Sequence, residues 1–154
     1  MNITLTPIGF VKNNRTEIED DNWGQITSEI ELADHIVAEA LDGIETFSHL
    51  HIIFYMDKVL DEKAKAQSRH PRNNLELPKL GTYAQRNKNR PNKLGLTIVE
   101  LIKRRGRIII VKNLDAINGT AVLDIKPVMK EFQPLTEIKQ PNWTKEIMKN
   151  YWGN

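Results

Sequence analysis

Two stretches of the sequence concentrate polar side chains where the backbone is constrained. The first, residues 81–97, reads GTYAQRNKNRPNKLGLT and places Arg86 and Arg90 around a turn. In this turn Pro91 fixes φ and Asn92 can bond its own backbone. A rigid turn of this kind can hold guanidinium groups and main-chain amides around an anionic ligand, because an arginine fork matches a carboxylate or a phosphate. The same residues also suit a loop that is held together by internal ion pairs.

The second stretch, residues 114–127, reads LDAINGTAVLDIKP and carries Asp115, Asp124 and Lys126 near predicted strand ends. The two carboxylates can accept hydrogen bonds from an adenine or a ribose. They can also pair with Arg86 or Arg90 of the first stretch. The residue types therefore suggest a polar ligand site without identifying the ligand.

Several reaction classes are excluded by what the chain lacks. It has no cysteine, so it has no disulfide scaffold, no Cys-type zinc site and no thiol nucleophile. No G-x-G-x-x-G, P-loop, H-E-x-x-H or G-x-S-x-G motif occurs, which argues against a Rossmann nucleotide site and the usual zinc and serine hydrolases. His49 and His51 share a strand face, but no third ligand accompanies them. We expect a packed or hydrogen-bonded pair and no metal site.

Charge is segregated along the chain although the formal net charge is only +2. Residues 1–62 carry 3 Lys/Arg against 13 Asp/Glu, whereas residues 63–112 carry 14 against 2. A folded block with such an excess of cations presents a positive surface, for which a polyanion is the natural partner. The alternative is that the basic block pairs with the acidic first third inside one compact domain.

Short strands dominate the elements that must position these side chains. Alternation and β-branched content predict strands over residues 3–11, 26–32, 49–56, 80–84, 95–102 and 108–111. The Asn118–Gly119 pair predicts a hairpin that joins residues 111–117 to residues 120–125. Residues 58–79 predict a helical turn followed by a long loop. This pattern favours a mainly β fold, a compact β-barrel-like domain with one or two short helices.

Two segments have helical periodicity. Residues 34–43 predict the principal core helix, with Asp34 as its N-cap and Gly43 as its stop. Residues 141–152 predict a short amphipathic helix whose apolar stripe is more typical of packing or a subunit contact than of a ligand site. We expect one domain over residues 1–154, with its core over 3–132. No apolar stretch is long enough for a bilayer and no signal peptide is evident, which predicts a cytoplasmic protein without membrane contact.

Read together, three motifs resemble the signatures of the TsaA-like (YaeB-like) family. They are FSHLHIIFYMDK at 47–58, GTYAQRNKNRPNKLGLTIVEL at 81–101 and LDAINGTAVLDIKP at 114–127. The resemblance implies a non-Rossmann β-barrel methyltransferase that binds S-adenosylmethionine at or near the interface of a homodimer. It also implies a tRNA substrate, methylated on N6 of the threonylcarbamoyl-modified adenosine immediately 3′ of the anticodon.

The resemblance also implies site residues. The implied cofactor contacts are Trp23, Gly24, Asp57, Lys58, Arg86, Lys88, Asn92, Ile98, Leu114, Asp115, Ala116 and Ile117. The catalytic candidates are Asp115, Asp124 and Lys126, with either carboxylate or bulk water as the acceptor of the amine proton. The basic block supplies the RNA-binding candidates Arg69, Arg72, Arg90, Arg104, Arg105 and Arg107.

Two other functions are consistent with the same residues. The basic block alone predicts a non-catalytic RNA-binding module with salt-sensitive affinity and no affinity for the cofactor. The cofactor motifs also suit a methyltransferase that acts on a small molecule or a protein. Binding of S-adenosylmethionine separates the first alternative from the enzyme, and methyl transfer to tRNA separates the second.

Overall fold

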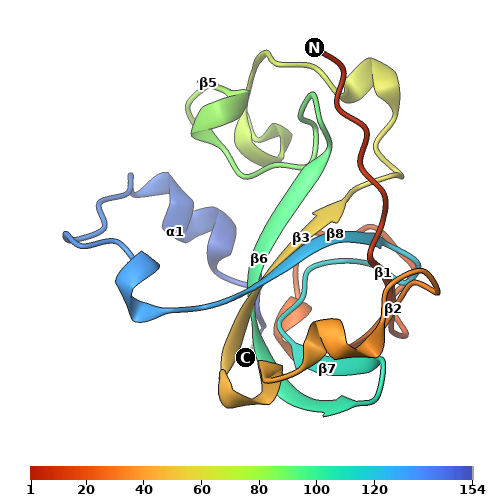
Figure 1. Cartoon of the computed structure of the whole chain (residues 1–154). Coiled ribbons are helices and arrows are strands. Elements are labelled where there is room, and N and C mark those ends of the chain that lie inside the picture. The colour runs from red at the N-terminus through yellow and green to blue at the C-terminus, as the bar shows by residue number, and fades with distance from the viewer. Residues whose placement is uncertain (154) are drawn as a thin grey trace.

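A computed structural model describes residues 1–153 and shows a closed barrel (Figure 1). Its strands are β1 (Gly9–Lys12), β2 (Thr27–Leu32), β3 (His49–Tyr55), β6 (Leu94–Arg105), β7 (Ile108–Lys112) and β8 (Ala121–Pro127). The order around the barrel is β1-β2-β7-β6-β3-β8, and all of these pairings are antiparallel. The predicted mainly β, barrel-like fold is confirmed.

The remaining elements are short. β4 (Ser68–Arg69) and β5 (Leu80–Gly81) form a separate two-stranded sheet. The 3-10 helices are η1 (Trp23–Gln25), η2 (Ala38–Leu41), η3 (Ile44–Thr46), η4 (Asp61–Lys63), η5 (Pro71–Asn73), η6 (Thr82–Ala84) and η7 (Lys130–Phe132). The α-helix α1 (Trp143–Met148) lies to one side of the barrel, beyond η7 (Figure 1). Within residues 1–153, no helix has the length and apolar character needed to cross a bilayer.

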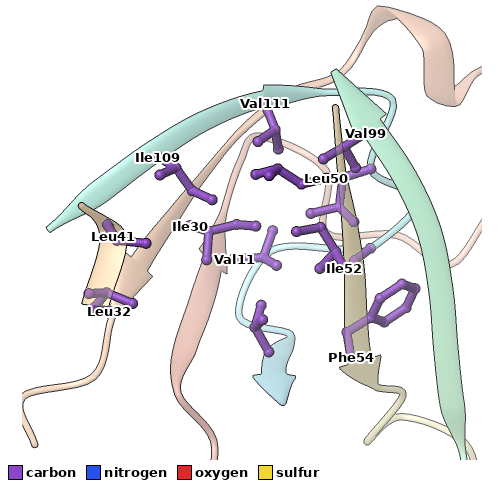
Figure 2. Close-up of a cluster of buried hydrophobic side chains, with 13 residues drawn as sticks. Val11, Ile30, Leu32, Leu41, Leu50, Ile52, Phe54, Val99, Ile109 and Val111 are labelled. Carbon is purple, nitrogen blue, oxygen red and sulfur yellow. The ribbon is translucent and has the colours of Figure 1, made fainter. Parts of the chain in front are cut away.

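The core forms because alternate residues of each strand point into the barrel. On β3, Leu50, Ile52 and Phe54 are buried, while the residues between them face outward. Apolar side chains from the other strands meet them at the barrel axis, among them Val11, Ile30, Val99, Ile109 and Val111 (Figure 2). Full burial of each such side chain contributes roughly 1.5–3 kcal/mol. The barrel is therefore stabilised by its packed apolar core as well as by the hydrogen bonds between its strands.

The predicted core helix over residues 34–43 is wrong. Only η2 is helical there, and Val37 has an extended backbone and a 63% exposed side chain. The Arg107 guanidinium, from the turn between β6 and β7, donates to the carbonyl oxygens of Ala33 (2.7 Å) and Ile36 (2.8 Å). A helix over residues 34–43 would have used the Ile36 carbonyl internally. Tertiary hydrogen bonds have thus displaced the local preference.

The predicted hairpin at Asn118–Gly119 is also wrong, although the turn exists and Gly119 has φ +86°. β7 ends at Lys112, and β8 pairs with β1 and β3 rather than with β7. Between them, Leu114 and Ala116 are buried in the core, so residues 113–120 close one end of the barrel instead of continuing a strand.

Other predicted elements are shorter than expected. β1 starts only at Gly9, and the predicted strand over 80–84 is β5 followed by η6. The helical turn and long loop predicted over 58–79 are present as η4 and the segment after it. The C-terminal helix ends at Met148 because residues 150–152 bind residues 22–24 through their main chains.

We predict that Gly95→Ala destabilises the protein by about 1–3 kcal/mol, because a Cβ at this position of β6 would overlap the buried Phe54 ring. Gly81→Ala is the matched control, since a Cβ there meets no atom within 4 Å. Urea unfolding of the two variants measures the difference. Equal stabilities would contradict this account of the Gly95 contact.

Candidate functional site

The first half of β6 extends beyond its pairing with β7. β3 pairs with β6 from Leu94 to Glu100, whereas β7 pairs with it only from Glu100 to Arg105. Residues 94–99 of β6 therefore have no β7 partner on one side, and groups from loops bind there. Arg86 donates to the Leu96 carbonyl oxygen at 2.6 Å, and the Thr97 hydroxyl donates to Asp115. This edge brings the arginine loop and residues 113–118 together.

Asp115 is the centre of this cluster. One of its carboxylate oxygens accepts the Thr97 hydroxyl and the other accepts the Tyr151 hydroxyl. Burial, together with the negative charge of Asp115, raises the pKa of Tyr151 far above its usual range. Tyr151 therefore stays protonated and acts as a donor. The carboxylate is held at both oxygens by neutral hydroxyls and keeps further acceptor capacity for a ligand.

Arg15 shapes the loop that carries Trp23 and Gly24. Its guanidinium lies 3.6 Å from the centroid of the buried Trp23 ring. It also donates to the carbonyl oxygens of Asp21 (2.8 Å) and Asn22 (3.2 Å). A planar cation that stacks on the ring and binds two carbonyls fixes the path of the main chain.

Ion pairs join the loop of Trp23 and Gly24 to the basic block of residues 63–112. Arg72 donates to both carboxylate oxygens of Asp21, at 3.0 and 2.7 Å, and this hydrogen bonding raises the pKa of the Arg72 guanidinium. Lys88 Nζ lies 4.0 Å from Asp20. Acidic and basic segments that are far apart in the sequence therefore meet beside the Asp115 cluster.

An apolar patch covers the outer face of β3 and β6. Tyr55, Leu94, Leu96 and Ile98 point out of the barrel, and between 36% and 45% of each side chain's surface is exposed. The register places Tyr55 opposite Leu94 and His51 opposite Ile98. We call these four residues the outer apolar face. It adjoins the arginine loop, because the carbonyl of Leu96 accepts a hydrogen bond from Arg86.

The family model of the tRNA-methyltransferase O N-terminal domain matches residues 10–133. The chain belongs to this family. The match agrees with the motifs at 47–58, 81–101 and 114–127, so the resemblance to TsaA-like proteins is confirmed.

The relatives of this chain differ in how much of their own length it covers. A human tRNA (adenine(37)-N6)-methyltransferase is 38% identical over 102 residues, which are 66% of this chain and 23% of the relative. A probable S-adenosyl-L-methionine-binding protein of Methanothermobacter thermautotrophicus is 33% identical over 139 residues, 88% of this chain and 96% of the relative. The chain spans only 23% and 34% of the human relative and of one Archaeoglobus fulgidus relative.

The solved structures agree on the fold. TrmO from Pseudomonas aeruginosa superposes with a TM-score of 0.74 at 23% identity, covering 93% of this chain and 62% of that chain. This likeness supports the non-Rossmann barrel and, at this identity, nothing beyond the fold.

The structure brings part of the predicted cofactor set together. Lys88 lies near the acidic loop, and Arg86 is bound to β6 next to the cluster. Leu114 and Ala116 are buried, and together they fix the main chain on either side of Asp115. The half-buried Ile117 accepts a hydrogen bond from the Thr120 hydroxyl at 2.7 Å.

Asp57 and Lys58 form a second group beyond the end of β3. They pair with each other at 3.3 Å, near the turn that contains Asn92. Asn92 is exposed, and the residue after it, Lys93, has φ +51°.

Asp124 and Lys126 lie apart from Asp115. They face outward on β8, on the far side of β3 from β6, and they pair at 3.0 Å. Asp124 lines an apolar cleft of about 570 Å³ that also includes Leu41, Phe47 and Pro127. Neither Asp115 nor Asp124 hydrogen-bonds to Arg86 or Arg90 among the contacts of residues 1–153. Arg90 donates instead to the carbonyls of its own loop, at Gln85 and Asn87.

The predicted RNA-binding arginines have partners within the chain. Arg104 pairs with Asp42 at 2.8 Å and Arg105 with Glu29 at 3.0 Å. Arg69 donates to a main-chain carbonyl, and Arg107 donates to the main-chain carbonyls of Ala33 and Ile36. The alternative that acidic and basic segments pair with each other therefore accounts for several of these cations. Their contacts with RNA stay predictions.

Sequence reasoning missed four residues that organise the site: Arg15, Lys93, Thr97 and Tyr151. Tyr151 belonged to a stripe attributed to packing, and no sequence signal linked it to Asp115. Lys93 is buried, and its Nζ lies 2.5 Å from Asp61.

Of the two histidines on β3, His49 forms a hydrogen bond with Ser48 at 2.8 Å.

The raised pKa of Tyr151 predicts a pH dependence of stability. The unfolded chain loses this proton near pH 10, while the folded chain keeps it. Above that pH the unfolded state binds fewer protons, so the free energy of unfolding falls as the pH rises. Tyr151→Phe removes this contribution. Urea unfolding between about pH 9 and about pH 11 should give a shallower fall for the variant than for the wild type, and equal slopes would contradict the prediction.

Proposed function

We propose that this chain is an S-adenosylmethionine-dependent methyltransferase that acts on N6 of adenine 37 in tRNA. The acceptor we propose is the threonylcarbamoyl-modified adenosine immediately 3′ of the anticodon. The observation that carries the proposal is the cluster around Asp115, in a chain that belongs to this family. Thr97 of β6 and Tyr151 donate to Asp115, Arg86 binds the neighbouring Leu96 carbonyl, and the segment of Tyr151 binds the Trp23–Gly24 loop. Named relatives are tRNA (adenine(37)-N6)-methyltransferases or S-adenosyl-L-methionine-binding proteins.

The groups at this edge fit the chemistry of the cofactor. S-adenosylmethionine carries hydroxyl and amine donors, a carboxylate and an adenine ring. Asp115 offers carboxylate acceptor positions, Arg86 and Lys88 offer cations for the carboxylate, and Ile98 offers an exposed apolar surface for the ring. The main chain of residues 114–117 is fixed by burial and can give directional hydrogen bonds.

When bound, S-adenosylmethionine supplies an activated methyl group: the N6–carbon bond forms as the carbon–sulfur bond breaks, leaving S-adenosylhomocysteine. The protein's main task is to align the acceptor, and alignment can contribute roughly 7–11 kcal/mol. The N6 proton must also leave. Asp115 is the carboxylate of the cluster that can accept it, directly or through water; Asp124 and bulk water are the other acceptors, and Lys126 is a catalytic candidate as the cation paired with Asp124.

The same proposal includes a homodimer whose subunits meet at the outer apolar face. The four side chains of this face form a continuous surface on two paired strands, and burying it against a second copy removes that surface from water. Leu96 of this face binds Arg86 through its carbonyl, so the cofactor site would adjoin the subunit contact. With a tRNA substrate, we also propose a cytoplasmic location.

The first test is methyl transfer. Purified protein with methyl-labelled S-adenosylmethionine should label tRNA that carries threonylcarbamoyladenosine, and digestion should place the label on N6 of that nucleoside. Asp115→Asn should lower kcat/KM about 10²-fold or more, in the range of general acid–base and positioning effects.

The controls separate the competing functions. Calorimetry that shows salt-sensitive tRNA binding without any affinity for S-adenosylmethionine would identify an RNA-binding module and reject the enzyme. Cofactor binding without transfer to modified or unmodified tRNA would favour a small molecule or a protein as the acceptor. In that case charge reversal at Arg105, whose side chain is 60% exposed, leaves the activity unchanged.

Leu96→Glu tests the subunit contact. Leu96 lies in the outer apolar face, and a carboxylate there must stay hydrated, so the variant should be monomeric in sedimentation velocity. Leu75→Glu is the matched control, because Leu75 is 81% exposed and lies outside this face. A dimer that persists in Leu96→Glu, or a monomeric wild type, would reject this contact.

A further inference from the structure

Residues 150–152 lie on the loop that carries Trp23 and Gly24. The amides of Asn22, Trp23 and Gly24 donate in succession to the carbonyls of residues 150, 151 and 152, at 3.0, 2.8 and 2.7 Å. Three consecutive main-chain hydrogen bonds join segments about 130 positions apart in the sequence, so this contact is an ordered part of the fold. We call residues 150–152 the strap.

Gly24 is required by this contact. A Cβ on Gly24 would overlap the carbonyl oxygen of Trp152, so the strap approaches more closely than any side chain would permit. The ring of Trp152 meets that of Tyr151 edge to face, with centroids 5.0 Å apart. The strap thus has its own side-chain packing as well as its main-chain bonds.

Tyr151 links the strap to the carboxylate of the candidate site. Its hydroxyl donates to one Asp115 oxygen while Thr97 of β6 donates to the other. Two donors from different segments prevent the carboxylate from rotating and leave its remaining lone pairs with fixed directions. Tyr151 faces Asp115, Arg86 and Asp20, and it keeps its proton in this setting.

We infer that the strap completes the methyl-donor site, with Tyr151 as a positioning residue that orients Asp115 toward the adenosyl group of the donor. The inference rests on the proposed function. It adds a role for the C-terminal segment, which holds the Trp23–Gly24 loop through its main chain and the Asp115 carboxylate through one hydroxyl. Fixing both groups before the donor binds lowers the cost of ordering them on binding.

The test compares Tyr151→Phe with Tyr83→Phe. Each variant removes one hydroxyl, but Tyr83 is 75% exposed and belongs to no part of the site. Calorimetry with S-adenosylhomocysteine should show about 10-fold weaker binding for Tyr151→Phe, the size expected when a hydrogen bond to a charged group is lost, and less than 2-fold change for Tyr83→Phe. In the transfer assay, Tyr151→Phe should raise KM for S-adenosylmethionine and leave KM for tRNA unchanged.

A chain ended after Lys149 tests the strap as a whole. It should bind S-adenosylhomocysteine at least as weakly as Tyr151→Phe, while circular dichroism retains the barrel signal, because the six barrel strands end at Pro127. If this shortened chain does not fold, the Tyr151→Phe comparison still decides.

The outcomes separate this inference from the proposed function. A wild type that binds S-adenosylhomocysteine, together with a Tyr151→Phe variant of equal affinity, overturns the role of Tyr151 alone. A rise in both KM values would also overturn it, because general loosening of the fold would then explain the loss. A wild type that binds no S-adenosylhomocysteine rejects the proposed function, and the inference falls with it.

Discussion

The mismatch in length between β6 and β7 is the constraint on which the rest of the structure depends. β6 has 12 residues and β7 has 5, so β7 can pair with only part of its neighbour. Unpaired main-chain groups beside a core are costly, and the protein satisfies them with loops. Arg86 binds the Leu96 carbonyl, and residues 113–118 approach through Asp115. The candidate site is therefore the means by which an uneven barrel is completed.

This arrangement also explains why the site uses residues from four distant parts of the chain. A closed barrel of short strands offers little concave surface of its own, because its interior is filled with side chains. Figure 2 shows that the axis is occupied by Ile30, Leu50, Ile52 and their neighbours. A ligand site must then be built on the outside, from loops that are themselves held in place. Arg15 on Trp23, Arg72 on Asp21 and the strap on Gly24 each hold one loop.

The sequence was sufficient for the fold class, for most strands and for the motifs, because these depend on local patterns. Alternation identified β2, β3 and the β6–β7 pair, and the motif around Arg86 and Asp115 led to the family. Local patterns failed where long-range hydrogen bonds decided the structure. The segment before η2 has helical periodicity, but Arg107 binds its carbonyls. Asn118–Gly119 forms its turn, but the residues before it are buried in the core rather than paired in a strand.

The site shows the same division. Asp115 and Arg86 were recognisable by type and spacing, whereas nothing local connects Tyr151 to Asp115 or Arg15 to Trp23. The contact of Tyr151 with Asp115 depends on the main-chain bonds that hold residues 150–152 against residues 22–24, and Arg15 meets Trp23 through the folding of the loop between β1 and β2. Lys93 is a further case, since its burial follows from a positive φ in a turn that leaves its amine beside Asp61. Residue types thus predict which groups can do chemistry, and topology decides which of them meet.

The segregated charge has two separable consequences. Some basic side chains are used to hold the acidic first third in place, as the pairs of Arg72 with Asp21 and Arg104 with Asp42 show. Such exposed or half-exposed pairs contribute little to stability individually, typically below about 1 kcal/mol. Their effect is instead to fix loop geometry, since each joins segments more than 50 positions apart. Each such pair has no net charge, because the carboxylate cancels most of the arginine's long-range field. The paired arginines therefore order loops, and the attraction of a polyanion is left to the cations of the basic block that have no acidic partner within residues 1–153.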